Sequence, residues 1–201
     1  MIKEVVLATG NKGKVREFSK LLEGVFGNVI SLSDLDSPPE VIEDGKTFRE
    51  NALKKAREIA KYSGKLTLAD DSGLEVEALD GRPGVYSARY SGEGATANTN
   101  IAKLLEELGT NNNRNARFVC VLALVDPNGE ELVVEGFCEG TVLDKPRGEG
   151  GFGYDPVFYL SDRKKTMAEV DPETKNLISH RAKACQSLRA KLESKERLSE
   201  A

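Results

Sequence analysis

Two long apolar segments joined by a tight turn constrain the fold of this chain more than any other feature. They cover residues 117–125 and 131–143, and the Asp-Pro-Asn-Gly sequence at 126–129 between them is typical of a β-hairpin. The first segment is apolar on both faces, so we expect a central strand that is covered on both sides. Glu135 and Glu139 leave one face of the second segment partly open to water. The chain is therefore expected to build on a sheet that contains a long antiparallel pair.

The start of the chain predicts a different kind of connection. Residues 4–8 form a short apolar run, and after a turn at 9–11 a helical pattern follows through Val15, Phe18 and Leu22. A strand that leads into a helix is typical of a crossover between parallel strands. Further helical patterns occupy residues 48–59, 101–108 and 182–192. Hairpin and crossover together predict an α/β fold, with a long mixed β-sheet and helices on both sides.

Two stretches of the chain, at residues 81–94 and 148–154, are rich in glycine. No repeat and no linker divides the chain, so residues 1–201 are expected to form a single domain. Within it we expect two lobes around a central cleft, which the glycine-rich stretches would flank. The charged tail at residues 193–201 is expected to fray.

Composition limits the classes of function. Hydrophobic residues make up 39% and charged residues 31%, and no apolar run approaches the roughly 20 residues of a membrane span. We therefore expect a cytoplasmic protein that acts without a membrane. The net charge is -4 and the basic residues are scattered, which argues against nucleic acid as a partner. Three widely spaced cysteines indicate buried thiols, and neither a disulfide framework nor a zinc site.

The turn before the first helix is a candidate phosphate site. Unpaired N–H groups at a helix N-terminus favour an anion, glycines let the backbone approach it, and a lysine adds a point charge. The spacing from Gly10 to Lys14 is too short for a Walker loop, and Val15 replaces its hydroxyl residue. An ordinary glycine-lysine turn before a helix is the alternative. The candidate residues are Thr9, Gly10, Asn11, Lys12, Gly13 and Lys14.

Paired carboxylates at the end of an apolar strand are a candidate magnesium site. Asp70 and Asp71 follow the buried strand predicted at residues 66–69, and Glu43 is available from the long polar loop at 33–46. Adjacent carboxylates repel, so a cation explains them, and magnesium prefers a few carboxylates completed by phosphate and water oxygens. Neighbours in a strand point to opposite faces, so one is interpreted as a base and the other as a ligand, unless the chain bends after them. The alternative is that they cap a following turn.

An aromatic pair among glycines, in residues 150–156, is a candidate site for a planar base. Phe152 offers a ring face at low entropic cost, and the glycines let the edge of a base reach backbone groups. Aromatic residues between glycines also pack protein cores, and that alternative stays open.

Polar residues before and at the start of the last helical pattern form a fourth group. Lys175, Ser179, His180 and Arg181 could donate hydrogen bonds to acceptor atoms of a ligand. His180 is the only histidine of the chain, and the alternative is an ordinary surface residue. No paired cysteine or serine motif indicates a catalytic triad.

Together these segments resemble the inosine triphosphate pyrophosphatase family, whose members remove non-canonical purine nucleotides. The resemblance spans nearly the whole chain, and the motifs occur in the family's order. They are LATGNKGKVREF at 7–18, EDGKTFRENALKKA at 43–56, LADDSGLEVEAL at 68–79, GRPGVYSARYSG at 81–92, GGFGYDPVF at 150–158 and ISHRAKA at 178–184.

The resemblance implies a magnesium-dependent enzyme that converts ITP, dITP and XTP to the monophosphate and pyrophosphate. It also implies a homodimer, with two α/β lobes around a nucleotide cleft. Asp71 would be the general base, and Glu43, Asp70 and Asp71 would lie at the metal. The implied substrate residues are Thr9 to Lys14 and Lys55 for the triphosphate, Ser72, and for the purine Phe152, Gly153, Tyr154, Asp155, Lys175, His180 and Arg181.

Two other functions stay open from the sequence. One is a pyrophosphatase for other modified nucleotides, such as modified pyrimidines or methylated bases. The other is a regulatory module that binds a nucleotide without hydrolysing it. Release of pyrophosphate from a panel of triphosphates separates all three.

Overall fold

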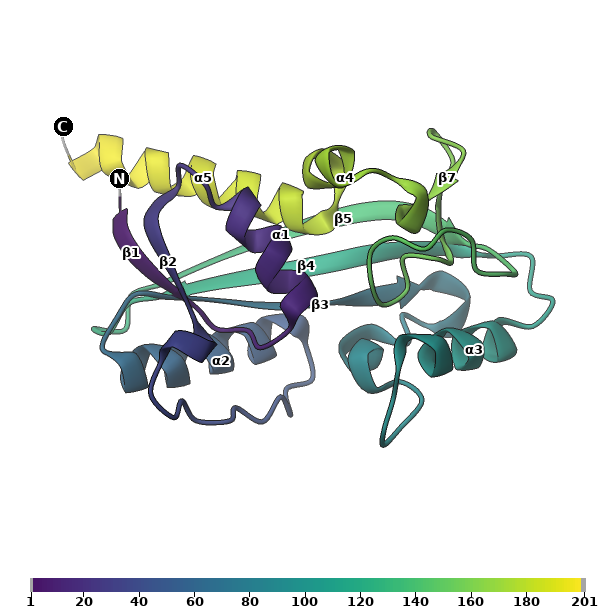
Figure 1. The fold of residues 1–201 in the computed structure, drawn as a ribbon, viewed down its shortest axis with the longest axis horizontal. Coiled ribbons are helices and arrows are strands. Elements are labelled where there is room, and N and C mark those ends of the chain that lie inside the picture. Colours follow the sequence, from purple (N-terminus) through teal and green to yellow (C-terminus); the bar gives the residue numbers. More distant parts are fainter. Residues whose placement is uncertain (1, 200–201) are drawn as a thin grey trace. The chain divides into compact units, whose positions relative to one another are not determined.

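The computed structural model describes residues 2–199 and contains the α/β architecture that the sequence predicts (Figure 1). The helices are α1 (Lys12–Leu21), α2 (Phe48–Ser63), α3 (Ala97–Leu108), α4 (Pro172–Ile178) and α5 (His180–Ser199). The strands are β1 (Ile2–Leu7), β2 (Phe26–Ser31), β3 (Thr67–Val76), β4 (Asn115–Val125), β5 (Glu131–Val142), β6 (Phe158–Leu160) and β7 (Lys165–Thr166).

The strands form one mixed sheet in the order β2-β1-β3-β4-β5-β6-β7. β4 holds the middle place, as its doubly apolar sequence predicts, and its residues 118–125 are all buried. β1 is parallel to β2 and to β3, whereas β6 is antiparallel to β5 and to β7. The mixed sheet is therefore confirmed, with crossovers at its start and hairpins toward its end.

The chain divides into two compact units, which we call unit 1 and unit 2. Within the described residues, unit 1 comprises 2–71, 120–136 and 181–199, and unit 2 comprises 72–119 and 137–180. The chain passes from one unit to the other within β3, β4 and β5. It also does so at the start of α5, after His180.

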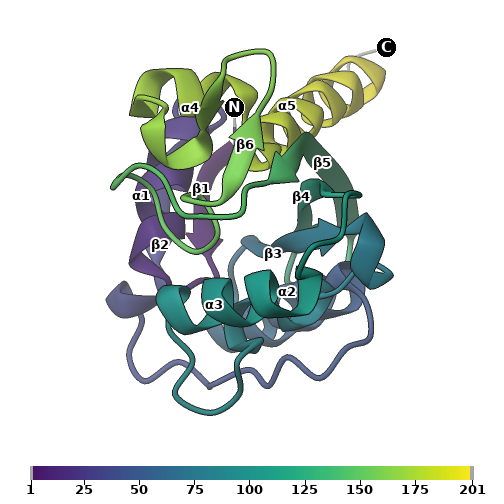
Figure 2. The ribbon, with the colours of Figure 1, turned by 90° about the vertical axis from the view of Figure 1, so that its right-hand side faces the viewer.

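Helices cover both faces of the strands in unit 1. One core contains Val5 and Leu7 of β1 together with Phe18 of α1 and Leu188 of α5. Side chains alternate along a strand, so Val6 faces the other side, where α2 lies. Figures 1 and 2 show α2 on the opposite side of the strands from α5. The helices on both sides of the sheet are thus confirmed for this unit.

The start of α2 is fixed by the capping box that its sequence predicts. The Thr47 side chain accepts from Glu50 N at 3.1 Å, and the Glu50 carboxylate accepts from Thr47 N at 3.2 Å. The helix ends at Gly64, which adopts the left-handed conformation that glycine tolerates best. These ends define which side chains of α2 face the strands.

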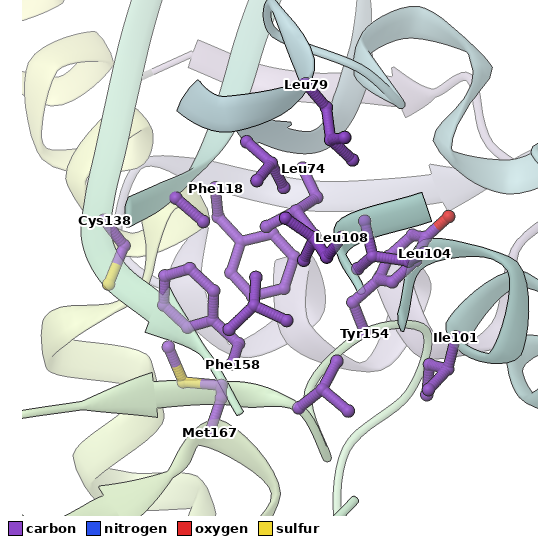
Figure 3. Close-up of a cluster of buried hydrophobic side chains, with 14 of the residues drawn as sticks. Leu74, Leu79, Ile101, Leu104, Leu108, Phe118, Cys138, Tyr154, Phe158 and Met167 are labelled. Carbon is purple, nitrogen blue, oxygen red and sulfur yellow. The ribbon is translucent and has the colours of Figure 1, made fainter. Parts of the chain in front are cut away.

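A second core lies within unit 2 (Figure 3). The rings of Phe118 and Phe158 lie 4.3 Å apart between centroids, and α3 contributes apolar side chains such as Leu104. Tyr154 joins this core, and its hydroxyl donates to the carbonyl of Ser87 at 2.9 Å. The ring of Tyr154 therefore packs inward, so the core-packing alternative holds for this member of the aromatic pair.

β3 differs from its prediction, because it does not end at Ala69. It continues through Asp70, Asp71 and Ser72 to Val76 without a turn, so the capping alternative for the two aspartates is wrong. Aspartate disfavours strands, but lysine and asparagine side chains pair with these two carboxylates inside the fold, and tertiary context overrides the propensity.

The C-terminal helix is longer than its apolar pattern. α5 reaches Ser199, so residues 193–199 of the expected frayed tail are helical, and residues 200–201 lie outside the described part. Within residues 2–199, no helix combines the length and the apolar character needed to cross a membrane. Cys120, Cys138 and Cys185 are free and buried, as expected.

Candidate active site

The predicted phosphate turn lies where the sequence places it, between the end of β1 at Leu7 and the start of α1 at Lys12. Asn11 caps the helix, because its Oδ1 accepts from Gly13 N at 2.9 Å and from Lys14 N at 3.1 Å. An anion at this helix start would therefore compete with the Asn11 side chain for two N–H donors. Among the other predicted members, Gly10 and Lys12 are exposed and Thr9 is buried.

Asp70 is fully buried, at 0% exposure, and forms an ion pair with Lys14, whose Nζ lies 2.7 Å from Asp70 Oδ2. Burial acts to raise the pKa of Asp70, but the charges of Lys14, Lys55 and Arg181 outweigh it and lower the pKa from 3.8 to about 2. Asp70 is thus a permanent carboxylate at neutral pH. That state suits a ligand for a cation and does not suit a proton acceptor.

Asp71 has the opposite electrostatic character, although it is the next residue of β3. It is 6% exposed, and its Oδ2 accepts from Asn51 Nδ2 at 2.9 Å. Burial raises the pKa of Asp71 from 3.8 to about 6, against the opposing influence of Lys55, Asn51 and Lys14. A carboxyl group with a pKa in this range can both take up and release a proton near neutral pH.

The two aspartates use opposite faces of β3, as strand geometry predicts. Asp70 pairs with a side chain of α1, whereas Asp71 binds a side chain of α2. The register of β1 against β3 ends at Leu7 opposite Leu68, so the aspartates lie beyond the end of β1. Both carboxylates can therefore act just beyond the end of β1. The charge of Lys55 acts to lower the pKa of each of them.

Lys55 connects the two aspartates to the long loop before α2. Its Nζ lies 2.9 Å from Glu43 Oε1, and the side chain is largely buried. Burial acts to lower the pKa of Lys55, but the charges of Asp70, Glu43 and Asp71 outweigh it and raise the pKa. Glu43, predicted from a distant segment of the sequence, is thus brought to the same cationic side chain as the aspartate pair.

Arg181 also belongs to this group within unit 1. It is buried and forms an ion pair with Glu17 of α1, with Nη1 3.1 Å from Oε2, and its charge lowers the pKa of Asp70. The resemblance assigns Arg181 to the purine, and that role stays a prediction. In this structure the guanidinium group pairs with Glu17, and its charge acts on the Asp70 carboxylate.

The net charge of this group favours the binding of a cation. The cations are Lys14, Lys55 and Arg181, and the carboxylates are Glu17, Glu43, Asp70 and Asp71. Four carboxylates against three cations give a slightly negative group, to which a triphosphate alone would bind poorly. In the described part of the chain, no three His, Cys, Asp or Glu side chains gather closely enough to hold a metal by themselves. Hard oxygen donors that need phosphate and water to complete the shell fit magnesium.

Unit 2 contains the aromatic-glycine segment. The Asp155 carboxylate accepts from Phe152 N at 2.8 Å and pairs with Lys175, whose Nζ lies 2.6 Å away. The same ammonium group lies 5.0 Å from the centroid of the Phe152 ring, which is only partly buried. A Cβ at Gly151 would meet Asp155 Oδ2 at 2.0 Å, so glycine is needed there. The segment is thus a fixed turn around a buried carboxylate, with Gly153 partly buried.

His180 is not the surface residue that the alternative interpretation expected. It is 2% exposed, and its ring stacks on Phe118 with centroids 4.7 Å apart and an interplanar angle of 17°. Ser179 is buried beside it in the chain, and Ser72 is partly buried in β3. The polar residues that were predicted to bind a purine are therefore mostly buried, and burial limits the conformations of their side chains.

Sequence reasoning missed two members of the group in unit 1, Asn51 and Glu17. Asn51 is fully buried and binds Asp71, and Glu17 pairs with Arg181. A signal for Asn51 was present, because it lies one turn before Lys55 on a stripe of α2 whose other buried residues are apolar. Glu17 offered none, since a glutamate beside an apolar helix stripe is ordinary.

Comparisons with known proteins agree on one family. The model of the Ham1 family matches residues 5–191. The chain is 52% identical to the dITP/XTP pyrophosphatase of Desulfotalea psychrophila, over 94% of this chain and 85% of that protein. It is 54% identical to the dITP/XTP pyrophosphatase of Geobacter sulfurreducens, over 90% of this chain and 92% of that protein.

Solved structures give the same result. The Ham1 protein of Staphylococcus aureus is 46% identical with a TM-score of 0.87, over 96% of this chain and 100% of that one. A HAM1 protein from Coxiella burnetii is 43% identical with a TM-score of 0.88, over 96% of this chain and 100% of that one. The α/β fold described above is thus the fold of these proteins.

Proposed function

The chain belongs to the Ham1 family, and from this membership we propose that it is a nucleoside triphosphate pyrophosphohydrolase for non-canonical purine nucleotides. Its substrates are ITP, dITP and XTP, and its products are the nucleoside monophosphate and pyrophosphate. The names of relatives that share about half of its residues support this activity. The observation that carries it is the pair Asp70 and Asp71, buried beside Lys14 and Lys55 at the end of β1.

The reaction needs a cation, and we propose Mg2+, held by Glu43, Asp70 and Asp71 together with oxygens of the phosphate and of water. The slightly negative charge of the group in unit 1 supports this proposal, because a triphosphate adds further negative charge that a cation would offset. When bound, the ion supplies positive charge to the phosphate oxygens and to the departing group. Lys14 and Lys55, which neutralise Asp70 and Glu43 in this structure, are then available to phosphate oxygens.

Asp71 takes the proton of the attacking water in the proposed reaction. The water oxygen bonds to the α-phosphorus, the bond from that phosphorus to the bridging oxygen of pyrophosphate breaks, and the proton passes to the Asp71 carboxylate. Asp71 is preferred to Asp70 because Asp70 is fully buried and held by Lys14, whereas Asp71 retains some exposure. The Thr9 to Lys14 turn and Lys55 position the triphosphate.

In this proposal the purine is recognised by residues from several segments of the chain: Ser72, Phe152, Gly153, Tyr154, Asp155, Lys175, His180 and Arg181. Hypoxanthine and xanthine carry an oxygen acceptor at position 6, where adenine carries an amino donor. A donor placed for the oxygen would face another donor when ATP binds, and an unsatisfied buried group costs about 1–3 kcal/mol. The buried position of His180 supports a fixed donor of this kind.

A panel of triphosphates tests the proposed activity. With Mg2+ present, pyrophosphate release from ITP, dITP and XTP is expected to exceed release from ATP by about 100-fold in kcat/KM, as several mismatched polar contacts would give. Chelation of the metal should abolish release from all of them. Faster turnover of UTP or TTP than of ITP would favour a pyrophosphatase for other modified nucleotides, and binding without any release would favour a regulatory module.

His180→Ala tests base recognition. We expect the ratio of kcat/KM for ITP to that for ATP to fall by about 10-fold, because one donor to the 6-oxo group is removed. Arg181→Ala is expected to lower the same ratio, since the resemblance assigns Arg181 to the purine, and also to lower kcat/KM for both nucleotides, because it removes a cation that acts on Asp70. An unchanged ratio in a folded His180→Ala protein would move base recognition to other residues.

We further propose that the enzyme acts in the cytoplasm as a homodimer, without nucleic acid or a membrane. Three free and buried cysteines fit a reducing compartment. Sedimentation of the purified protein at several concentrations tests the dimer, and a monomer at all of them would contradict it.

A further inference from the structure

Asn51 connects the proposed base to the loop before α2. The side chain is 0% exposed and lies within the first turns of α2. Its Nδ2 donates to Asp71 Oδ2 at 2.9 Å, and its Oδ1 accepts from Gly45 N at 2.8 Å. One amide group therefore touches Asp71 on one side and the loop backbone on the other.

The two partners of Asn51 leave a single orientation for its amide. A backbone N–H can only donate, so Gly45 requires the amide oxygen. An ionised carboxylate can only accept, so Asp71 requires the NH2 group. Rotation of the amide by half a turn would break both bonds in a place that water does not reach. The amide therefore fixes the rotation of the Asp71 carboxylate and favours its charged form.

The contact with the loop is close as well as specific. A Cβ at Gly45 would lie 2.6 Å from Asn51 Oδ1 and 2.8 Å from Glu50 Cβ, so only glycine fits at this distance. Two residues earlier, Glu43 is held by Lys55, with 2.9 Å between the charged atoms. Asn51 and Lys55 lie one turn apart on the same face of α2, and each binds one residue of the loop.

We propose that Asn51 is a positioning residue, which holds the Asp71 carboxylate in its working orientation and couples it to the loop that carries Glu43. The proposal rests on the proposed function, because it assigns Asn51 a part in the same hydrolysis. Asn51 does not touch the reacting atoms. It fixes the orientation of the Asp71 carboxylate and holds the loop segment that contains Glu43 in place beside it.

Asn51→Leu removes both hydrogen bonds without adding charge and keeps a similar volume. Pyrophosphate release from ITP is measured by steady-state kinetics, with rates referred to the folded fraction of each protein. We expect kcat to fall by about 10- to 100-fold, as is typical when an outer partner of a catalytic group is lost. KM should change by less than about threefold, because the residues that bind the nucleotide are intact.

Asn100→Leu is the matched control, in α3 of unit 2. Asn100 is also buried, accepts from Ser91 N at 2.7 Å, and donates to the carbonyl of Ala88 at 3.2 Å. Loss of these bonds should lower the melting temperature as in Asn51→Leu, but kcat should stay within about twofold of wild type. The comparison separates a positioning role from general loss of stability.

Gly45→Ala tests the coupling between Asn51 and the loop from the loop side. It tests the positioning role of Asn51 even if Asn51→Leu does not fold. The added methyl group would displace the amide of Asn51 or the loop, and kcat should fall in the same direction, although Gly45 donates to Asn51 and not to Asp71. Wild-type kcat in folded Asn51→Leu or in folded Gly45→Ala would overturn the proposal, as would an equal loss of kcat in Asn100→Leu. A wild-type chain that releases no pyrophosphate would instead remove the proposed function, and with it the reaction that Asn51 serves.

Discussion

Replacing Asp71 with asparagine is expected to lower kcat for pyrophosphate release by about 10²–10⁴-fold, the usual contribution of a general base. The substitution preserves the shape of the side chain, and its amide oxygen can still accept the hydrogen bond from Asn51. It removes the ability to take a proton from water. Nucleotide binding should persist, which calorimetric titration with ITP and Mg2+ can measure alongside the steady-state kinetics.

Asp70→Asn is the control for that result. It removes a carboxylate that is paired with Lys14 and has a pKa of about 2, so a different defect is expected. The concentration of Mg2+ needed for half-maximal activity should rise, while activity at saturating Mg2+ should recover in part. If Asp70→Asn were inactive at every concentration and Asp71→Asn turned over normally, the roles of base and ligand would be reversed.

The sequence predicted those parts of the fold that depend on local patterns. The hairpin around residues 126–129 and the capping box of Thr47 and Glu50 were found where they were expected. Both signals involve neighbouring residues, and each has a direct physical cause in backbone conformation or hydrogen bonding. The order of the strands in the sheet follows less directly, because it depends on contacts between distant segments.

β3 shows where local patterns fail. Asp70 and Asp71 are poor strand formers, and the sequence alone allows a turn or a bend at this point. The strand continues because Lys14 and Asn51, distant in sequence, pair with the two carboxylates within unit 1. The predicted division of roles needed only the alternation of a strand, so the structure supplies separate surroundings for each aspartate without changing that inference.

The candidate site was predicted more completely in its charged residues than in its neutral ones. Lys14, Glu43 and Lys55 were singled out, and the ion pairs around β3 bring them together. Asn51 was not, because a neutral amide has no distinctive pattern unless its burial is known. A polar residue on an apolar helix stripe is the cue that comes closest to identifying it.

Lys55→Met is expected to destabilise the protein in the presence of a chelator by about 3 kcal/mol, the low end of the range for removing one member of a buried ion pair. Lys55 faces Glu43, Asp70 and Asp71, so its loss leaves these carboxylates to repel one another. For a chain of this size, a loss of that magnitude lowers the melting temperature by about 6–12 °C. Thermal unfolding followed by circular dichroism in EDTA measures it.

Mg2+ should reverse much of this loss, which tests the metal site without any measurement of activity. A cation bound by the same carboxylates would replace the missing positive charge, so added Mg2+ should raise the melting temperature of Lys55→Met more than that of wild type. Lys54→Met is the matched control, because Lys54 pairs with Asp44 on the exposed face of α2 at 2.7 Å. Loss of that solvent-screened surface pair should leave the melting temperature close to that of wild type, with no added response to Mg2+. If Mg2+ stabilised all three proteins equally, the carboxylates around Lys55 would not be the metal site.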